Sequence, residues 1–179
     1  MRELSNTLTY TIPALALIWY LILEKKSLPG FIQLMPERRD LRPFFIGFPA
    51  LTLIGLVLSL VMTNFSVLMP PRVEAPAGVI GWIIMLFSCG ATGYLEESFF
   101  RFYLLKKMEE WSYLLWLRIL LSVLLFAFCH LYEGPWGILN SALAGLLLAV
   151  LFERYRSFHG IAWAHGAYNA FVYFMGIFS

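Results

Sequence analysis

Three pairs of side chains share a four-residue spacing in the second half of this chain, where the sequence is otherwise strongly apolar. The pairs are Glu97 with Arg101, Phe126 with His130, and His165 with Asn169. Residues four apart lie on one face of an α-helix, so the two members of each pair should point the same way. Glu96 precedes the first pair and should point elsewhere, because adjacent residues diverge by about 100° on a helix. We expect Glu97 to form the ion pair with Arg101.

These residue types are the ones that hydrolysis requires. A carboxylate and an imidazole can deprotonate a water molecule, while an imidazole N–H and an amide can hold a developing oxyanion. A charge at the centre of a membrane helix costs about 2.5–3.5 kcal/mol on insertion scales, which makes such residues functional candidates. Taken singly, the pairs have plainer explanations: an interfacial ion pair, an interfacial histidine, and a hydrogen bond that packs two helices. Only their combination predicts a site.

The chain lacks the signatures of other intramembrane proteases. Asp40 is the only aspartate, which excludes an aspartyl protease with its two aspartates. None of the three histidines is followed by glutamate, so the H-E-x-x-H zinc motif is missing. No serine stands in a G-x-S-G context, and Cys129 would diverge from its neighbour His130 on a helix. Glutamate remains as the candidate base.

The elements that must position these residues are membrane helices. Of the 179 residues, 60% are hydrophobic and 13% are charged, and the mean hydropathy is +0.75. A soluble domain carries roughly 25% charged residues, so this chain cannot cover a water-facing surface. The composition excludes disorder, nucleic-acid binding and a coiled coil. It predicts an all-α, polytopic protein that forms one integral membrane domain over residues 1–179, in contact with the lipid bilayer.

Hydropathy predicts about six transmembrane helices. They cover residues 8–23, 44–63, 77–100, 114–131, 138–152 and 161–178. The first lacks the basic start and the A-x-A end of a signal peptide, so we expect an uncleaved helix. The small residues of 88–93 should let a neighbouring helix pack closely against the third. Upright helices would hold Glu96, His130 and His165 at different depths, so we expect tilted or broken helices.

Positive charges are unevenly divided among the loops. Eleven of the 13 Lys and Arg fall in or near the first, third and fifth loops, and only Arg2 and Arg72 fall on the other side. Loops on the cytoplasmic side of a membrane are enriched in Lys and Arg, so we expect both termini outside. Outside the motifs, Arg118 should reach the membrane interface and His159 should lie in a loop. The compact size suggests a prokaryotic cytoplasmic membrane.

The three motifs resemble those of the CPBP family, which comprises CAAX proteases and bacteriocin-processing or Abi proteins. That family shows E-E-x-x-x-R, F-x-x-x-H and H-x-x-x-N, each in a membrane helix, and this chain carries them in the same order within residues 93–172. The stretch 144–154, with its small residues and Glu-Arg ending, is also similar. The resemblance implies a CAAX-protease-like helical bundle that acts as an intramembrane endopeptidase.

The resemblance also implies roles for individual residues. The catalytic set would be Glu96 and His130, which activate water, and His165 and Asn169, which line the oxyanion site. The supporting set would be Glu97, Arg101 and Phe126. In the family a glycine often follows the arginine. Here Phe102 does, and it should narrow the cavity beside the site.

Metal dependence is an open question within this resemblance. Many family members are described as metalloproteases, and Glu96, His130 and His165 could ligate zinc with one position left open. The likeness to eukaryotic CAAX endopeptidases favours a glutamic mechanism instead. We therefore expect no metal and no other cofactor.

The sequence thus predicts an endopeptidase that hydrolyses a peptide bond in a membrane-associated peptide or protein. Bacteriocin-like peptides, C-terminal sorting tags and CAAX-like tails are the candidate substrates. The alternative is a non-catalytic bacteriocin self-immunity protein or peptide-binding scaffold, which would depend on packing at Gly90 or Gly93 instead of on Glu96. A transporter ranks third, because the chain is small and has no internal repeat.

Overall fold

The fold is an all-α helical bundle. The computed structural model describes residues 12–13, 15–17, 19–20, 35–64 and 74–178, and no strand occurs among them. The helices are η2 (Arg38–Asp40), α2 (Leu41–Asn64), α3 (Gly78–Glu97), η3 (Ser98–Leu105), α4 (Lys106–Glu110), α5 (Leu115–Cys129), η4 (Leu131–Glu133), α6 (Gly134–Tyr155) and α7 (Phe158–Phe178). Of the helix expected over 8–23, only the described positions can be compared, and these are helical. The later five predicted helices are confirmed, with shifted ends.

The third helix is the one that differs most from its prediction. It does not end at residue 100 but continues through η3 and α4, so that one helical rod runs from Gly78 to Glu110. No Gly or Pro interrupts residues 94–110, and the rod stops only before Ser112, which has a positive φ of 62°. The middle section, η3, is a π-helix and contains Arg101. Helices of this rare type occur mostly as short segments at functional sites.

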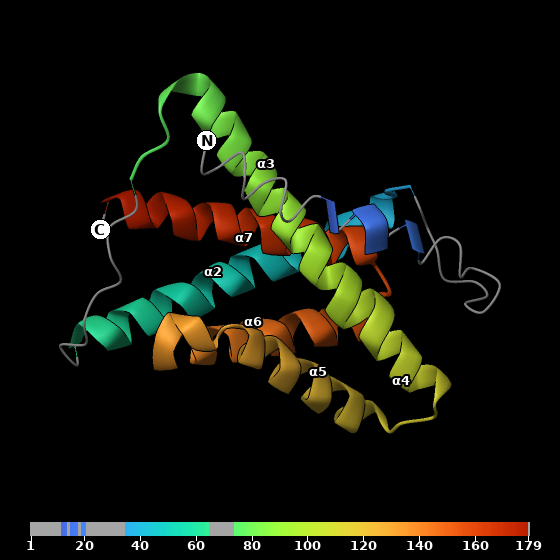
Figure 1. Cartoon of the computed structure of the whole chain (residues 1–179). Helices are drawn as coiled ribbons and strands as arrows, with labels where there is room; N and C mark the ends of the chain where they lie inside the picture. The colour runs from blue at the N-terminus through green and yellow to red at the C-terminus, as the bar shows by residue number, and fades with distance from the viewer. Residues whose placement is uncertain (1–11, 14, 18, 21–34, 65–73, 179) are drawn as a thin grey trace.

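The rod runs across the other long helices, whereas α5 and α6 lie side by side. α7 packs against α3 on one side and α2 on the other, and α6 packs against α5 and α2 (Figure 1). A core of Leu51, Leu148, Phe152, Ile161 and Ala164 fills the space where α2, α6 and α7 meet. The rod of α3, η3 and α4 passes diagonally over this group, so its middle meets the middle of α7.

Small residues allow α3 and α7 to touch at their backbones, as the run 88–93 predicted. A Cβ atom at Gly93 would lie 2.8 Å from both the Ala162 carbonyl oxygen and the Gly166 nitrogen. A Cβ at Gly166 would lie 3.0 Å from the Cα of Gly90. Such close approach is typical of membrane helices that pack through glycine.

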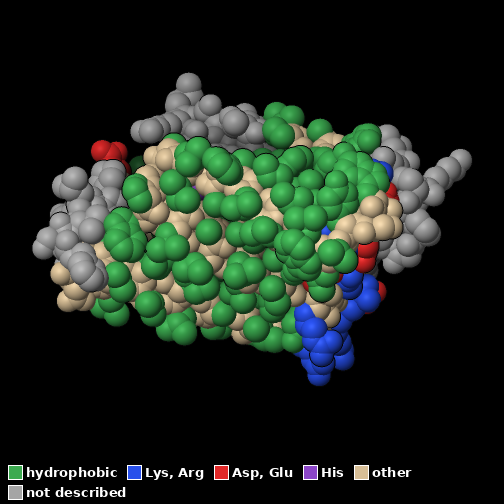
Figure 2. All heavy atoms as spheres, turned by 90° about the horizontal axis from the view of Figure 1, so that it is seen from below, with side chains coloured by type: hydrophobic (Ala, Val, Ile, Leu, Met, Phe, Trp, Pro, Cys, Tyr) green, Lys and Arg blue, Asp and Glu red, His purple; other side chains and the backbone are tan. Residues whose placement is uncertain are grey.

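The outer surface is that of a membrane protein. Large apolar side chains such as Val79, Ile80 and Phe128 are more than half exposed, and Figure 2 shows a face covered by hydrophobic side chains, with Lys and Arg gathered at one end. Among the described residues, three helical stretches are long and apolar enough to cross a membrane: Arg38–Met62, Gly78–Glu110 and Leu131–Tyr155. In a bilayer these apolar side chains face lipid tails and need no protein partner. Each helix also satisfies its own backbone hydrogen bonds.

Candidate active site

A buried ion pair forms the base of the site. Glu97 ends α3, Arg101 lies one turn later in η3, and both side chains are completely buried. Arg101 Nη1 donates to Glu97 Oε1 at 3.0 Å, and Nη2 donates to the backbone oxygen of Gly145 in α6, also at 3.0 Å. A buried charge is costly unless it is paired and hydrogen-bonded. Glu97 and Arg101 therefore neutralise each other, and Gly145 fixes the direction of the guanidinium.

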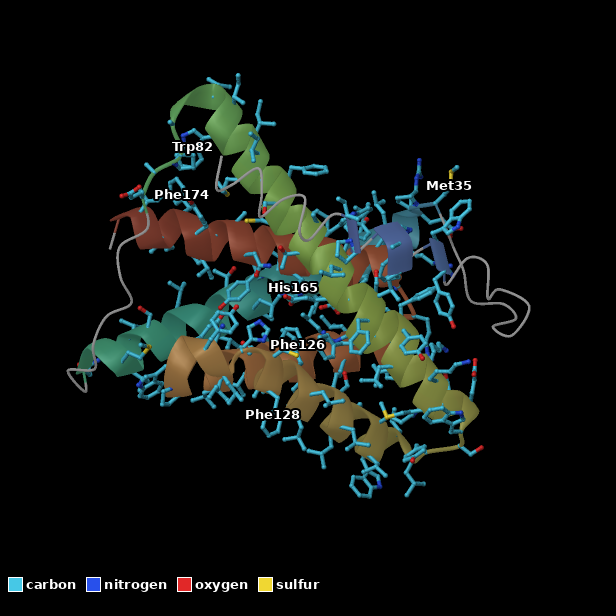
Figure 3. All side chains as sticks on the ribbon, in the orientation of Figure 1. Met35, Trp82, Phe126, Phe128, His165 and Phe174 are labelled. Carbon is cyan, nitrogen blue, oxygen red and sulfur yellow. The ribbon has the colours of Figure 1, made fainter. Side chains whose placement is uncertain are left out.

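His165 lies between the two neighbouring glutamates. Its Nδ1 is 2.8 Å from Glu97 Oε1, and its Nε2 is 3.5 Å from Glu96 Oε2 (Figure 3 labels His165). An ionised carboxylate only accepts hydrogen bonds, so Nδ1 carries the hydrogen and Nε2 faces Glu96. The two glutamates point differently, as the helical geometry predicted, and Glu97 rather than Glu96 pairs with Arg101. This leaves Glu96 Oε2 buried and without a hydrogen-bond partner among the described residues.

His130 stands where α5 ends. Its Nδ1 lies 2.8 Å from the backbone oxygen of Phe126, one turn earlier. A carbonyl oxygen is an acceptor, so Nδ1 carries the hydrogen and Nε2 of the neutral ring remains available as a base. The local backbone thus selects the tautomer that a general base needs.

The ring of Phe126 contacts three members of the cluster, and Figure 3 shows it near His165. Its centroid is 4.6 Å from the Arg101 guanidinium carbon, 4.7 Å from the His130 ring and 5.9 Å from the His165 ring. A cation over an aromatic face is stabilised by the ring quadrupole. Phe126 therefore packs against both histidines and against the buried arginine.

Glu96 and His130 line one cavity of about 390 Å³. Its other walls are apolar or weakly polar: Pro13, Leu17, Leu95, Phe99, Phe100 and Cys129. Two groups able to move a proton thus face a pocket large enough for part of a peptide. His165 does not line this cavity, although it lies beside Glu96.

Asn169 is the one predicted site residue that the structure does not tie to the others. It lies one turn after His165 on α7 and is half-buried. Within the part of the chain that is described, no hydrogen bond joins its amide to Glu96, His130 or His165. Tilted helices bring the other residues to a similar depth, because the rod crosses α7 at Gly93, one turn before Glu97, and α5 ends just before His130.

Two interpretations from the sequence are wrong. His159 is not in a loop but in the first turn of α7, where its Nδ1 lies 3.0 Å from the Tyr94 hydroxyl. Phe102 does not narrow the cavity, because it is buried against the ring of Phe158, with 5.2 Å between centroids. In both cases the partner is distant in sequence, and the local pattern gave no sign of it. The interface position of Arg118 stays a prediction; its side chain is 9% exposed and lies 3.4 Å from Glu109.

Sequence reasoning also missed Gly145 as a partner of Arg101. The interaction uses a backbone oxygen, which every residue has. The only available signal was the small side chain, since a Cβ at this position would lie 3.0 Å from Phe126 and 3.4 Å from Arg101 Nη2.

The alternative zinc set does not form a metal centre in this geometry. Among the described residues, no group of three His, Cys, Asp or Glu side chains is placed to hold a metal ion. The Nδ1 hydrogen bonds of His165 and His130 are compatible with a metal, because a metal-ligating histidine usually donates its other N–H to a carboxylate or a backbone oxygen. Metal independence therefore stays a prediction.

The fold and the site together define a membrane-embedded helical enzyme with a carboxylate and an imidazole in one apolar cavity. Residues 78–171 match the family described as type II CAAX prenyl endopeptidase Rce1-like. The match covers more than half of the chain and all of the predicted site residues, and the chain belongs to this family of CAAX proteases. The search of curated proteins gave no match, and neither did the search of solved structures.

Proposed function

We propose that the protein cleaves a membrane-associated peptide or protein by glutamate- and histidine-activated attack of water. The observation that carries this proposal is the shared cavity of Glu96 and His130. A glutamate oxygen without a partner and a histidine nitrogen free to accept a proton are both what a water-activating pair needs.

The proposed reaction assigns each proton a place. Glu96 and His130 hold a water molecule and take a proton from it as its oxygen attacks the scissile carbonyl carbon. The oxyanion that forms is stabilised by the amide N–H of Asn169 and by Nε2–H of His165 in its doubly protonated form, in which Nδ1–H still donates to Glu97. When the carbon–nitrogen bond breaks, the proton returns to the leaving amine, so that no co-reactant besides water is consumed.

Glu97 and Arg101 act indirectly in this scheme. Glu97 accepts a hydrogen bond from His165 Nδ1 and so fixes the imidazole beside Glu96. Arg101 compensates the buried charge of Glu97 and holds its carboxylate in place. Glu97 and Arg101 are therefore positioning residues, which is the supporting role that the family resemblance implied for them.

Substitution of Glu96 tests the proposal most directly. In Glu96→Gln the side chain keeps its size but loses its basicity, so cleavage should fall by about 10²-fold or more while the protein remains folded. Membrane peptides from cells with the wild type and with Glu96→Gln would be compared by mass spectrometry, with Glu74→Gln, an exposed glutamate away from the cavity, as the matched control. Unchanged cleavage by Glu96→Gln would remove this residue from the mechanism.

The same experiment separates the enzyme from the non-catalytic alternative. An immunity protein or peptide-binding scaffold would keep its phenotype in both Glu96→Gln and His130→Ala. The cleaved peptides would distinguish bacteriocin-like leaders, C-terminal sorting tags and CAAX-like tails. Activity of the purified protein in the presence of a chelator tests the metal-independent mechanism, which predicts no loss.

A further inference from the structure

A second group of hydrogen bonds joins α3 to α7 one turn away from the Glu97–His165 bond. The indole nitrogen of Trp163 donates to the Tyr94 hydroxyl at 2.8 Å, and the same hydroxyl lies 3.0 Å from His159 Nδ1. An indole N–H is only a donor, so the hydroxyl accepts from Trp163 and its own hydrogen can be given to His159. The three side chains form a chain with one consistent direction.

This chain lies close to the proposed catalytic layer on both helices. Tyr94 precedes Glu97 by three residues, and Trp163 precedes His165 by two, which correspond to about 4.5 Å and 3 Å along the helix axes. A sliding movement of α7 along α3 would therefore stretch the Trp163–Tyr94 bond and the His165–Glu97 bond together.

Packing alone between these two helices has no directional component. Gly93 and Gly166 bring the backbones of α3 and α7 together, and the rings of Tyr94 and Phe158 also pack between the helices. The hydrogen bonds of Tyr94 and Glu97 to side chains of α7 are directional and lie just beyond the glycine contact. They therefore add a constraint on the register of α7 that packing does not supply.

We propose that Tyr94 is a positioning residue for the reaction, which it serves by fixing the register of α7 and hence the place of His165 beside Glu96 and Glu97. The inference rests on the proposed function, because the register of α7 affects catalysis only if His165 takes part in the reaction. Displacement of a reacting group by about 1 Å can cost as much as 10²-fold in rate. Tyr94 is not among the described residues that line the proposed reaction cavity.

The variant Tyr94→Phe removes the hydroxyl and keeps the ring, which packs on Phe158 with 5.5 Å between centroids. We expect kcat for the cleaved peptide to fall about tenfold, with KM within about twofold of the wild type, because register affects the reacting groups more than substrate binding. Trp163→Phe should act similarly, and the double variant should be no worse than either single one, since both remove the same bond. Tyr155→Phe is the matched control.

A measurement without substrate completes the test. In protein with isotopically labelled histidine, the imidazole NMR signal of His165, assigned through His165→Gln, should move in Tyr94→Phe and not in Tyr155→Phe. An unmoved signal together with an unchanged kcat overturns the inference. It is also overturned if Tyr94→Phe lowers activity and unfolding temperature while Trp163→Phe changes neither. If the His165 signal moves but the wild type cleaves no peptide, the proposed function fails, and only the contribution of Tyr94 to the register of α7 stands.

Discussion

Glu96 and Glu97 are neighbours in the sequence, but their surroundings differ completely. Glu97 is fully buried and shares its Oε1 atom between Arg101 and His165, whereas the Glu96 side chain is 19% exposed and borders the cavity. This difference follows from the divergence of adjacent side chains on a helix. Glu97 therefore stabilises the site through its contacts with Arg101 and His165. Glu96 borders the cavity, where it can act on a water molecule.

The buried ion pair makes a prediction about stability. Arg101→Met leaves Glu97 as an uncompensated buried charge, so the free energy of unfolding should fall by roughly 3–5 kcal/mol. The double variant Glu97→Gln/Arg101→Met has no buried charge and should recover much of this loss. Unfolding of the purified proteins in detergent measures both values.

The double variant should nevertheless remain poorly active. A neutral amide holds His165 less firmly than a carboxylate, so the imidazole is no longer fixed beside Glu96. Recovery of both stability and activity would show that Glu97 and Arg101 only balance each other and do not position His165.

At the scale of the elements, the sequence predicted which helices exist but not how the rod of α3 and η3 is built. Hydropathy and the four-residue spacings were sufficient to locate the helices and the Glu97–Arg101 pair, because both depend on local periodicity. The π-helix over Ser98–Leu105 could not be foreseen, since its residues suit an ordinary helix. The Arg101–Gly145 and Tyr94–His159 bonds could not be foreseen either, because they join residues brought together only by tertiary packing.

The helix crossing provides a matched pair of glycine substitutions. Gly93→Ala places a methyl group 2.8 Å from two backbone atoms of α7, which cannot rotate away, so the protein should lose about 1–3 kcal/mol of stability. A Cβ at Gly90 meets nothing within 4 Å, so Gly90→Ala should change stability by no more than about 0.5 kcal/mol. This separates two glycines that the sequence treated alike.

Unfolding in detergent and peptide cleavage together check this pair. Gly93→Ala should also lose activity, because the Glu97–His165 bond spans the same crossing. Equal effects of the two substitutions would mean that α3 and α7 do not meet at Gly93 in the membrane.

The whole molecule has an apolar body and one strongly charged end (Figure 2). At this end Glu109 of α4 accepts two hydrogen bonds from Arg156, both 3.0 Å long, and lies 3.4 Å from Arg118 of α5. Glu153 of α6 is 2.7 Å from Arg156. The ends of three helices are therefore tied by charges that belong in water or at the lipid headgroups, which sets how the bundle sits in the bilayer.

The excess of basic residues at this end predicts the orientation of the protein. Ser112, in the turn between α4 and α5, should face the cytoplasm, and the highly exposed Tyr132 in η4 should face the opposite side. Single cysteines can be introduced as Ser112→Cys and Tyr132→Cys after both native cysteines, Cys89 and Cys129, are replaced by alanine. A membrane-impermeant maleimide should then label Tyr132→Cys in intact cells, and Ser112→Cys only after permeabilisation.

The result also bears on how a substrate reaches the site. The His130 ring lies 6.2 Å from the Tyr132 ring, whereas Glu110 is about 21 Å from Glu96 along the rod. If Tyr132→Cys is labelled from outside, the cavity lies nearer to the outer than to the cytoplasmic face, and peptides on that side have the shorter path to Glu96. Labelling of Ser112→Cys in intact cells would show that the protein has the opposite orientation. The shorter path to Glu96 would then start on the cytoplasmic side. Labelling of both variants in detergent is the control that each thiol is accessible.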